Sequence, residues 1–253
     1  MIRRIGCLLL VCFLQACSVM PPPDPMMPGQ KARNMVVQRI SAVMVTDHDD
    51  ASRWANSGFP VTCKSGEADG GSATPISPDG YFLTANHVLA RMAGRKVFVI
   101  YGCVSSVTPV LARVVWRSAR ADLALLHIPV PTGFYYQWTY PDRWLPEGSG
   151  VIHGGIATGL NAKFGKLSTS LAPESAWTVS RKFKIDIPLQ PGDSGGPVVD
   201  AYGALVGVNS AVEFLVPMET AFFVDSEATR PNTRRIESLM RSDRSRNNYP
   251  APP

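Results

Sequence analysis

The stretch QPGDSGGPVVD, residues Gln190 to Asp200, places one serine in a turn that is dense in glycine. Gly, Asp, Ser and Pro are favoured in tight turns, so composition alone indicates only a turn before a short apolar strand. The order of these residues is far more specific, because at average amino-acid frequencies the hexapeptide GDSGGP arises by chance at about one in ten million positions. A serine hydroxyl becomes a nucleophile only when a base lies within hydrogen-bond reach and a carboxylate orients that base. The chain must therefore supply a histidine and an aspartate in matching settings.

One histidine and one aspartate stand at the ends of apolar strands. His87 follows the run GYFLTAN, where a strand is predicted to end and a short helical turn to begin. Asp122 precedes the apolar run LALLHIP, and an aspartate buried there is costly unless it is paired. The other histidines are His48 in a charged loop, His127 in a continuous strand run and His153 in a glycine-rich strand. Those three are predicted to be ordinary surface or packed side chains.

Three motifs together carry a family resemblance. TANH around His87, ADLALL around Asp122 and GDSGGP around Ser194 resemble the motifs of the trypsin-like (chymotrypsin-fold) serine peptidases, in that family's chain order. The resemblance implies that Ser194 is the nucleophile, His87 its general base and Asp122 the group that orients the base. It also implies an oxyanion hole formed by the backbone N–H groups of Gly192 and Ser194. Ser210 matches the family serine that hydrogen-bonds the aspartate.

The apolar pattern predicts an all-β protein between residues 35 and 241, because short runs rich in Val, Ile, Leu and aromatic residues alternate with turn residues. The predicted strands are 36–46, 80–85, 96–101, 111–116, 122–128, 150–157, 166–171, 197–199 and 204–212, with helical turns at 86–90 and 232–240. The resemblance implies two six-stranded antiparallel β-barrels with the active site at their interface and a short C-terminal helix. The boundary between the barrels is expected near residues 133–145.

The N-terminus has the pattern of an exported protein. Residues 1–16 place two arginines before an apolar run that is too short to span a bilayer, which predicts a signal peptide. With Cys17, the end of this segment resembles the lipobox of bacterial lipoproteins, which implies a lipid on Cys17 and a membrane-anchored protein of the cell envelope. The residue after it, Ser18, favours the outer membrane, facing the periplasm. An ordinary cleaved signal peptide that ends near a chance cysteine is the alternative.

The segments that flank the predicted domain are polar or rich in proline. Residues 17–34 contain five prolines and no apolar period, so they predict an extended tether. Residues 242–253 are polar and end in proline, which predicts a disordered tail. After export, Cys63 and Cys103 are the cysteines of the folded part and form a candidate disulfide, with two separate buried thiols as the alternative.

Charge and ligand patterns narrow the classes of partner. The net charge of +5 falls to +3 without residues 1–16, which carry two arginines (5 − 2 = 3), and this is too small to predict nucleic-acid binding. The Cys and His spacings match no metal site, so neither a metal nor a cofactor is predicted. The expected partners are a polypeptide substrate and, through the lipid, the membrane; an envelope protein complex is left open.

Four residues are predicted to line the substrate pocket: Pro188, Leu189, Ala211 and Val212. The resemblance places Pro188 six positions before Ser194, where a trypsin has the aspartate that binds Arg or Lys. Val212 stands where glycine leaves the pocket open in the family, so it should narrow the pocket. The predicted preference is cleavage after small aliphatic residues such as Ala or Val.

The resulting hypothesis is a lipid-anchored serine endopeptidase that hydrolyses peptide bonds through an acyl-enzyme. The alternative is a non-catalytic binding or scaffold lipoprotein with the same fold, and an esterase using the same triad has no distinct feature in its favour. In the family's digestive members the aspartate before the nucleophile binds a newly cut N-terminal amine. A lipid-tethered N-terminus is not free to do this, so the partner of Asp193 is unassigned.

Overall fold

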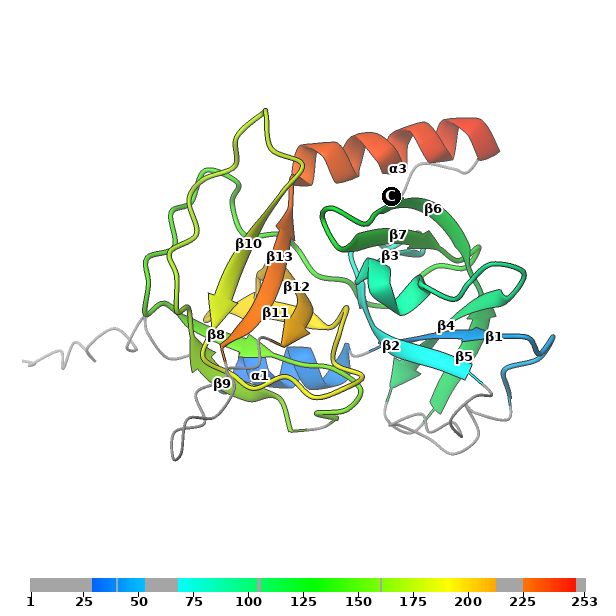
Figure 1. Ribbon diagram of the computed structural model, residues 1–253, viewed down its shortest axis with the longest axis horizontal. Helices are drawn as coiled ribbons and strands as arrows, with labels where there is room; N and C mark the ends of the chain where they lie inside the picture. The colour runs from blue at the N-terminus through cyan, green and yellow to red at the C-terminus, as the bar shows by residue number, and fades with distance from the viewer. Residues whose placement is uncertain are drawn as a thin grey trace, which may run out of the picture.

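Two curled antiparallel β-sheets lie side by side in the computed structural model, which describes residues 29–39, 41–52, 68–103, 106–159, 161–212 and 225–248. Figure 1 shows the first sheet on the right and the second on the left. The first sheet has seven strands in the order β5-β4-β1-β2-β3-β7-β6. They are β1 (Ser41–Thr46), β2 (Ala68–Pro75), β3 (Tyr81–Thr84), β4 (Lys96–Cys103), β5 (Ser106–Leu111), β6 (Arg113–Ser118) and β7 (Leu123–His127).

The second sheet has six strands in the order β10-β13-β12-β11-β8-β9. They are β8 (Gly150–His153), β9 (Lys163–Lys166), β10 (Ser180–Ile185), β11 (Pro197–Asp200), β12 (Leu205–Val212) and β13 (Ser226–Pro231). The prediction of two antiparallel β-units with a C-terminal helix is confirmed, except that the first sheet has seven strands where six were expected.

Strand β7 shows how the sequence pattern places the two sheets against each other. Its five residues, LALLH, are all buried. Successive side chains of a strand point to opposite faces, and here Leu123 and Leu125 join a core cluster that also contains residues of the second sheet, such as Ile152 and Val199. On the other face, Ala124 joins the separate core of the first sheet. Because its two faces join different cores, β7 lies where the two sheets meet.

An N-terminal helix corrects two predictions. Helix α1 (Gln30–Gln38) occupies the end of the predicted tether and the beginning of the strand expected at 36–46, and β1 starts only at Ser41. Ala32 and Val36 are four residues apart and both are buried, which is the spacing of one helix face. The helix contacts β8 and β11 of the second sheet, although the chain continues directly into the first sheet.

The C-terminal helix α3 (Thr233–Asn247) is longer than the predicted 232–240, so residues 242–247 of the expected disordered tail are helical. Asn232 caps the helix, because its side-chain oxygen accepts a hydrogen bond from the Arg235 N–H at 3.0 Å. In Figure 1 the helix leaves the second sheet and lies across the top of the first. Each terminal helix therefore packs on the sheet to which it is not directly joined.

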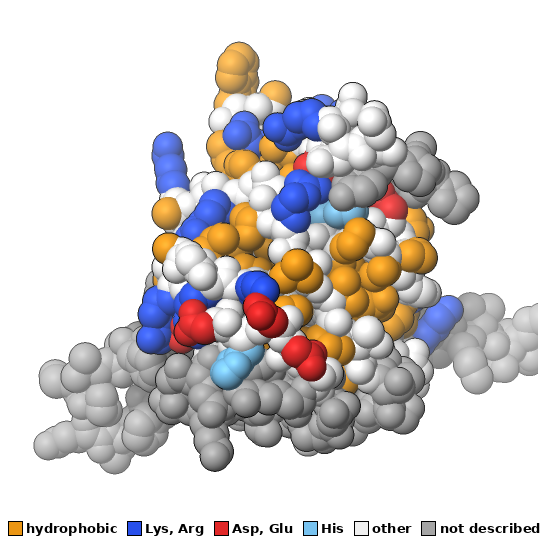
Figure 2. Space-filling view, turned by 90° about the vertical axis from the view of Figure 1, so that its right-hand side faces the viewer, with side chains coloured by type: hydrophobic (Ala, Val, Ile, Leu, Met, Phe, Trp, Pro, Cys, Tyr) orange, Lys and Arg blue, Asp and Glu red, His pale blue; other side chains and the backbone are white. Residues whose placement is uncertain are grey.

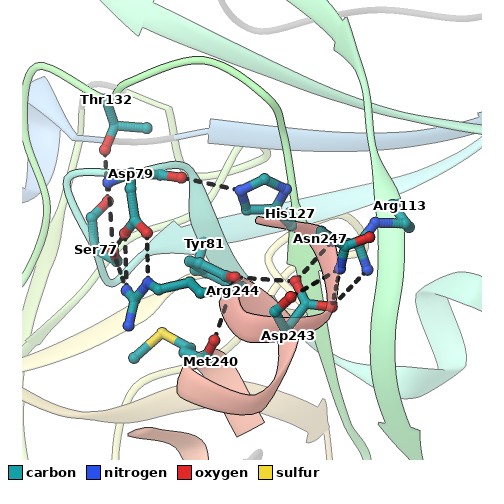
Figure 3. A network of polar contacts seen from close by, with 10 residues as sticks. All are labelled: Ser77, Asp79, Tyr81, Arg113, His127, Thr132, Met240, Asp243, Arg244 and Asn247. Atoms are coloured by element: carbon teal, nitrogen blue, oxygen red, sulfur yellow. Dashed lines mark hydrogen bonds and ion pairs between the residues drawn. The ribbon is translucent and has the colours of Figure 1, made fainter. Parts of the chain in front are cut away.

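A polar cluster holds the end of α3 on the first sheet (Figure 3). The Asp243 carboxylate accepts hydrogen bonds from both terminal nitrogens of Arg113, at 2.7 and 2.6 Å, and from the Tyr81 hydroxyl at 2.9 Å. Arg244 donates to both carboxylate oxygens of Asp79, at 2.6 and 2.9 Å. These contacts explain why the helix extends past the end of its apolar pattern.

The face of the molecule on the side of the first sheet carries both hydrophobic and charged side chains. Figure 2 shows hydrophobic side chains across the middle of this face, with Lys and Arg mainly toward its left and upper parts and Asp and Glu among them. No single charge covers this face. Within the residues that the structure describes, no helix is both long and apolar enough to cross a membrane.

Candidate active site

His87 is held by one aspartate through both its ring and its backbone. The buried strand β3 ends at Thr84, and the 3₁₀ turn η1 (Asn86–Leu89) then turns the chain so that the His87 side chain is half exposed. Its Nδ1 lies 2.9 Å from Asp122 Oδ2 and 3.1 Å from Oδ1. Its backbone N–H also donates to Asp122 Oδ1 at 3.0 Å. Both the ring and the backbone of His87 are therefore oriented by the same carboxylate.

Asp122 occupies an uncommon backbone conformation in the turn between β6 and β7. Its φ of 47° lies in the left-handed region, which aspartate tolerates better than most side chains. The Asp122 N–H donates to the Ala119 carbonyl at 3.2 Å, which closes the turn. From the second sheet, the Ser210 hydroxyl donates to Asp122 Oδ2 at 2.5 Å. The carboxylate thus joins residues of both sheets, and the family resemblance implies this contact of Ser210.

The pKa shifts of the pair point in opposite directions. The hydrogen bond to Asp122 raises the pKa of His87 above its ordinary value of 6.5, against the effect of burial. Burial raises the pKa of Asp122, but the hydrogen bonds from His87 and Ser210 outweigh it, so this pKa is lowered overall. The contact between the two groups contributes to both shifts, because the carboxylate stabilises a positive charge on the imidazole, and the Ser210 hydroxyl lowers the pKa of Asp122 further.

Ser194 lies between the sheets in the Ser194 loop, which we define as residues 190–196. Its carbonyl accepts a hydrogen bond from the Ser72 N–H of β2 at 2.8 Å, and its hydroxyl donates to the Ser210 carbonyl of β12 at 3.2 Å. Among the contacts of the described residues, the hydroxyl makes no hydrogen bond to His87. Gly195 has a φ of 87°, and a Cβ there would lie 2.2 Å from the Ser72 carbonyl oxygen, so only glycine fits beside the serine.

The backbone before Ser194 is equally constrained. Gly192 has a φ of 107°, which favours glycine, and its carbonyl accepts a hydrogen bond from the Ser72 hydroxyl at 2.7 Å. Within the described part of the chain, neither the Gly192 N–H nor the Ser194 N–H donates a hydrogen bond. Both residues, together with His87, line a cavity of about 360 Å³ that also reaches Arg91. Two residues whose backbone N–H groups have no partner among the described residues therefore line one cavity with the His87 imidazole.

The structure describes two of the four predicted pocket residues in full. Pro188 is exposed, whereas Leu189 is buried and its N–H donates to the Ser226 hydroxyl at 3.1 Å. Ala211 and Val212 end strand β12, and their side chains lie outside the described residues. The pocket therefore stays a prediction.

The structure does not describe the side chains of the three cysteines for which the sequence predicted a role. Cys17 and Cys63 lie outside the described residues, as does the side chain of Cys103 at the end of β4. The lipid attachment and the disulfide stay predictions. The described residues contain no cluster of His, Cys, Asp or Glu that would hold a metal ion.

The partner of Asp193 is a feature that the sequence did not predict. Its side chain is fully buried and accepts hydrogen bonds from the backbone and the hydroxyl of Thr158. His153, expected to be an ordinary packed histidine, lies beside them and is fully buried. No motif marks Thr158, because its contact with Asp193 joins two loops that are 35 residues apart.

Comparison with known proteins shows the family. The model of the trypsin-like peptidase domain matches residues 71–208, which is more than half of the chain, so the chain belongs to this family. It is 31% identical over 144 residues to the probable periplasmic serine endoprotease DegP-like of Bartonella henselae, covering 56% of this chain and 28% of the relative. It is 30% identical over 182 residues to the DegP-like protein of Pseudomonas fluorescens, covering 62% and 34% respectively.

The solved structures agree on the fold. The HtrA-type protease AlgW with tripeptide superposes with a TM-score of 0.58 at 22% identity, covering 83% of this chain and 61% of that one. At this identity the likeness concerns the fold alone. The chain spans about a third of the length of the curated relatives it matches.

Proposed function

We propose that the protein is a serine endopeptidase in which Ser194 is the nucleophile, His87 the general base and Asp122 the group that orients it. The single observation that carries the proposal is the arrangement around Asp122. This carboxylate binds the Nδ1 side of His87 at 2.9 Å and the Ser210 hydroxyl at 2.5 Å, and the Ser210 carbonyl in turn binds the Ser194 hydroxyl. Membership of the trypsin-like peptidase family supports the same assignment.

The proposed reaction begins with attack of the Ser194 hydroxyl on the carbonyl carbon of a peptide bond. His87 Nε2 takes the hydroxyl proton, and Asp122 stabilises the imidazolium through Nδ1–H. The N–H groups of Gly192 and Ser194 bind the oxyanion of the tetrahedral intermediate. His87 then gives its proton to the leaving amine, and water hydrolyses the acyl-enzyme by the same steps.

One rearrangement must precede this attack. In the structure the Ser194 hydroxyl donates to the Ser210 carbonyl, so it has to rotate toward His87 Nε2 before the proton can be transferred. Rotation about a single bond between staggered positions is a small change compared with the barrier of amide hydrolysis. Catalytic hydrogen bonds of this kind often tighten only when substrate binds.

For its location, we propose a periplasm-facing protein of the cell envelope, anchored through a lipid on Cys17. The relatives are named as probable periplasmic endoproteases, and the lipobox-like end of residues 1–16 supports the anchor. The proposed substrate is polypeptide, cleaved after small aliphatic residues because Pro188 carries no charge and position 212 holds a valine where the family resemblance implies a glycine. Cleavage of a peptide library mainly after Arg or Phe would refute this preference.

A fluorophosphonate probe tests the proposed chemistry, because it labels only an activated serine. The full-length chain should be labelled, whereas Ser194→Ala and His87→Ala should not be, each variant being shown to fold by its circular dichroism spectrum. Labelling that survives His87→Ala would remove His87 from its role. A folded parent chain that is not labelled would favour the alternative, a scaffold with an idle site.

A further inference from the structure

The strongest unexplained feature is a buried carboxylate inside the Ser194 loop. Asp193 lies between Gly192 and Ser194, which both line the cavity, and its side chain is fully buried. Burying a carboxylate is costly unless hydrogen bonds or an opposite charge stabilise it. The groups that bind the Asp193 side chain therefore also restrain the backbone of Gly192 and Ser194.

Thr158 supplies most of the contacts to this carboxylate. The Thr158 N–H donates to Asp193 Oδ1 at 2.9 Å, and its hydroxyl donates to Oδ2 at 2.7 Å. A third donor, the Gln190 N–H, binds Oδ2 at 3.0 Å from within the loop itself. No Lys or Arg among the residues described forms an ion pair with Asp193, so these donors are all neutral groups.

His153 extends the chain of hydrogen bonds behind Thr158. Its Nδ1 accepts from the Asn209 amide at 2.9 Å, which puts the ring proton on Nε2. That Nε2 lies 3.4 Å from the Thr158 hydroxyl and 4.0 Å from Asp193 Oδ2. Burial lowers the pKa of His153 to about 4, so the ring is neutral at neutral pH. The order of donation is Asn209 to His153, His153 to Thr158, and Thr158 to Asp193.

The surroundings leave the carboxylate little room to move. A Cβ on Gly155 would lie 2.3 Å from Asp193 Oδ1 and 2.7 Å from its Cα, so the strand end after β8 packs directly on the loop. On the opposite side, the Ser72 hydroxyl joins the Gly192 carbonyl at 2.7 Å to the Ile156 N–H at 2.8 Å. The 155–158 turn therefore contacts the loop directly at Asp193 and is joined to the Gly192 carbonyl through the Ser72 hydroxyl.

We propose that Thr158, oriented by His153, is a positioning residue that holds the Ser194 loop in its active shape through Asp193. The inference rests on the proposed function, and it adds that a neutral hydrogen-bond chain takes the place of a charged partner. Because the Thr158 hydroxyl and N–H bind both oxygens of the carboxylate, they fix the Asp193 backbone. The Gly192 and Ser194 N–H groups are then aimed at the cavity without any cleavage of the chain.

The test compares Thr158→Val with Thr158→Ser in the full-length chain. Valine keeps the shape and the backbone N–H but removes the hydroxyl, whereas serine keeps the hydroxyl. Loss of one oxyanion donor lowers kcat by about 10²–10³-fold, so a displaced loop should lower the kcat of Thr158→Val by about 10–100-fold with KM changed less than about 2-fold. Thr158→Ser should stay within about 3-fold of the parent chain in both constants.

A matched control separates positioning from ordinary loss of stability. Thr132 is also buried, and its hydroxyl donates to the Ser77 carbonyl at 2.6 Å (Figure 3); neither residue lines the cavity beside Ser194. Thr132→Val loses a comparable hydrogen bond and should keep the parent kcat. If Thr132→Val loses as much kcat as Thr158→Val, or if Thr158→Val keeps the parent kcat, the proposal is wrong.

Hydrogen exchange gives a readout that does not require activity. Exchange of the amides in residues 190–196 should become faster in Thr158→Val and stay unchanged in Thr132→Val. This comparison still decides the inference if the parent chain hydrolyses nothing, in which case only the proposed function fails. If Thr158→Val does not fold, His153→Phe provides the second variant: it removes Nε2–H, and unchanged exchange in the loop would overturn the proposal.

Discussion

Replacing Asp243 by asparagine should release the end of helix α3 from the first sheet. The Asp243 side chain is 3% exposed and accepts two hydrogen bonds from Arg113 and one from the buried Tyr81 hydroxyl. Asparagine can still accept the bond from Tyr81, but it loses the charge and places an N–H group against Arg113. The variant Asp243→Asn therefore tests how much of the helix depends on this carboxylate.

The magnitude follows from these contacts. A hydrogen bond to a charged group contributes about 1.5–3 kcal/mol, but the Arg113 side chain is 40% exposed, so water screens its share. We expect a loss of about 2–3 kcal/mol in the free energy of unfolding, which for a domain of this size lowers the unfolding midpoint by about 4–12 °C. Thermal unfolding followed by circular dichroism at neutral pH measures it.

Glu237→Gln on the same helix is the matched control. Glu237 pairs with Arg241 at 3.9 Å, and both side chains are more than half exposed, so the loss should be below about 0.5 kcal/mol. An Asp243→Asn midpoint within about 1 °C of the parent chain, or equal to that of Glu237→Gln, would refute the reasoning.

The pH dependence of the same contact has a definite sign. Burial raises the pKa of Asp243, but the hydrogen bonds from Arg113 and Tyr81 outweigh it and lower this pKa below the ordinary 3.8. A carboxylate with a lowered pKa in the folded state contributes stability that is complete above the unfolded pKa. The difference between Asp243→Asn and the parent chain should therefore be full at neutral pH and be lost as the pH falls through the folded pKa.

Three further predictions concern the site. Because the hydrogen bond to Asp122 raises the pKa of His87 above 6.5, acylation should fall as the pH drops through a midpoint above that value, and a flat profile down to pH 4 would contradict the role of His87. Ser210→Ala removes the 2.5 Å hydrogen bond to the aspartate and should lower kcat/KM about 10-fold or more in peptide hydrolysis; an unchanged value would exclude a contribution from Ser210. Gly155→Ala places a Cβ 2.3 Å from the buried carboxylate of the Ser194 loop and should lower the fluorophosphonate labelling rate by about 100-fold. Gly133→Ala, where a Cβ would meet nothing within 4 Å, should leave that rate unchanged; equal rates in the two variants would contradict the steric argument.

The candidate catalytic residues could be predicted because each belongs to a short, specific sequence motif. Gly192 and Gly195 have φ values of 107° and 87°, and no other residue type adopts such angles readily. The position of Asp122 before an apolar strand correctly indicated a paired carboxylate, and His87 after β3 is its partner. The short apolar runs likewise predicted an all-β protein, since a strand's side-chain period is a property of a few neighbouring residues. Its division into two β-units was implied by the family resemblance.

Helix α1 shows where a local pattern is ambiguous. Met35, Val36 and Val37 are β-favouring or neutral in isolation, and the sequence predicted a strand. The helix forms because Ala32 and Val36 are buried together against the second sheet, an arrangement that depends on strands far along the chain. Tertiary burial outweighs local propensity in such a segment.

By itself, the sequence determined the family, the two β-units and the residues proposed for chemistry, because each depends on residues that are close together or on a motif of fixed order. Only the tertiary structure decided which contacts hold helix α3 on the first sheet and the Ser194 loop in place. Asp243 meets Arg113 across 130 residues, and Asp193 meets Thr158 across 35. These pairs form only when whole sheets and helices pack together. A hydrogen bond between residues so far apart in the chain produces no periodic pattern in the sequence.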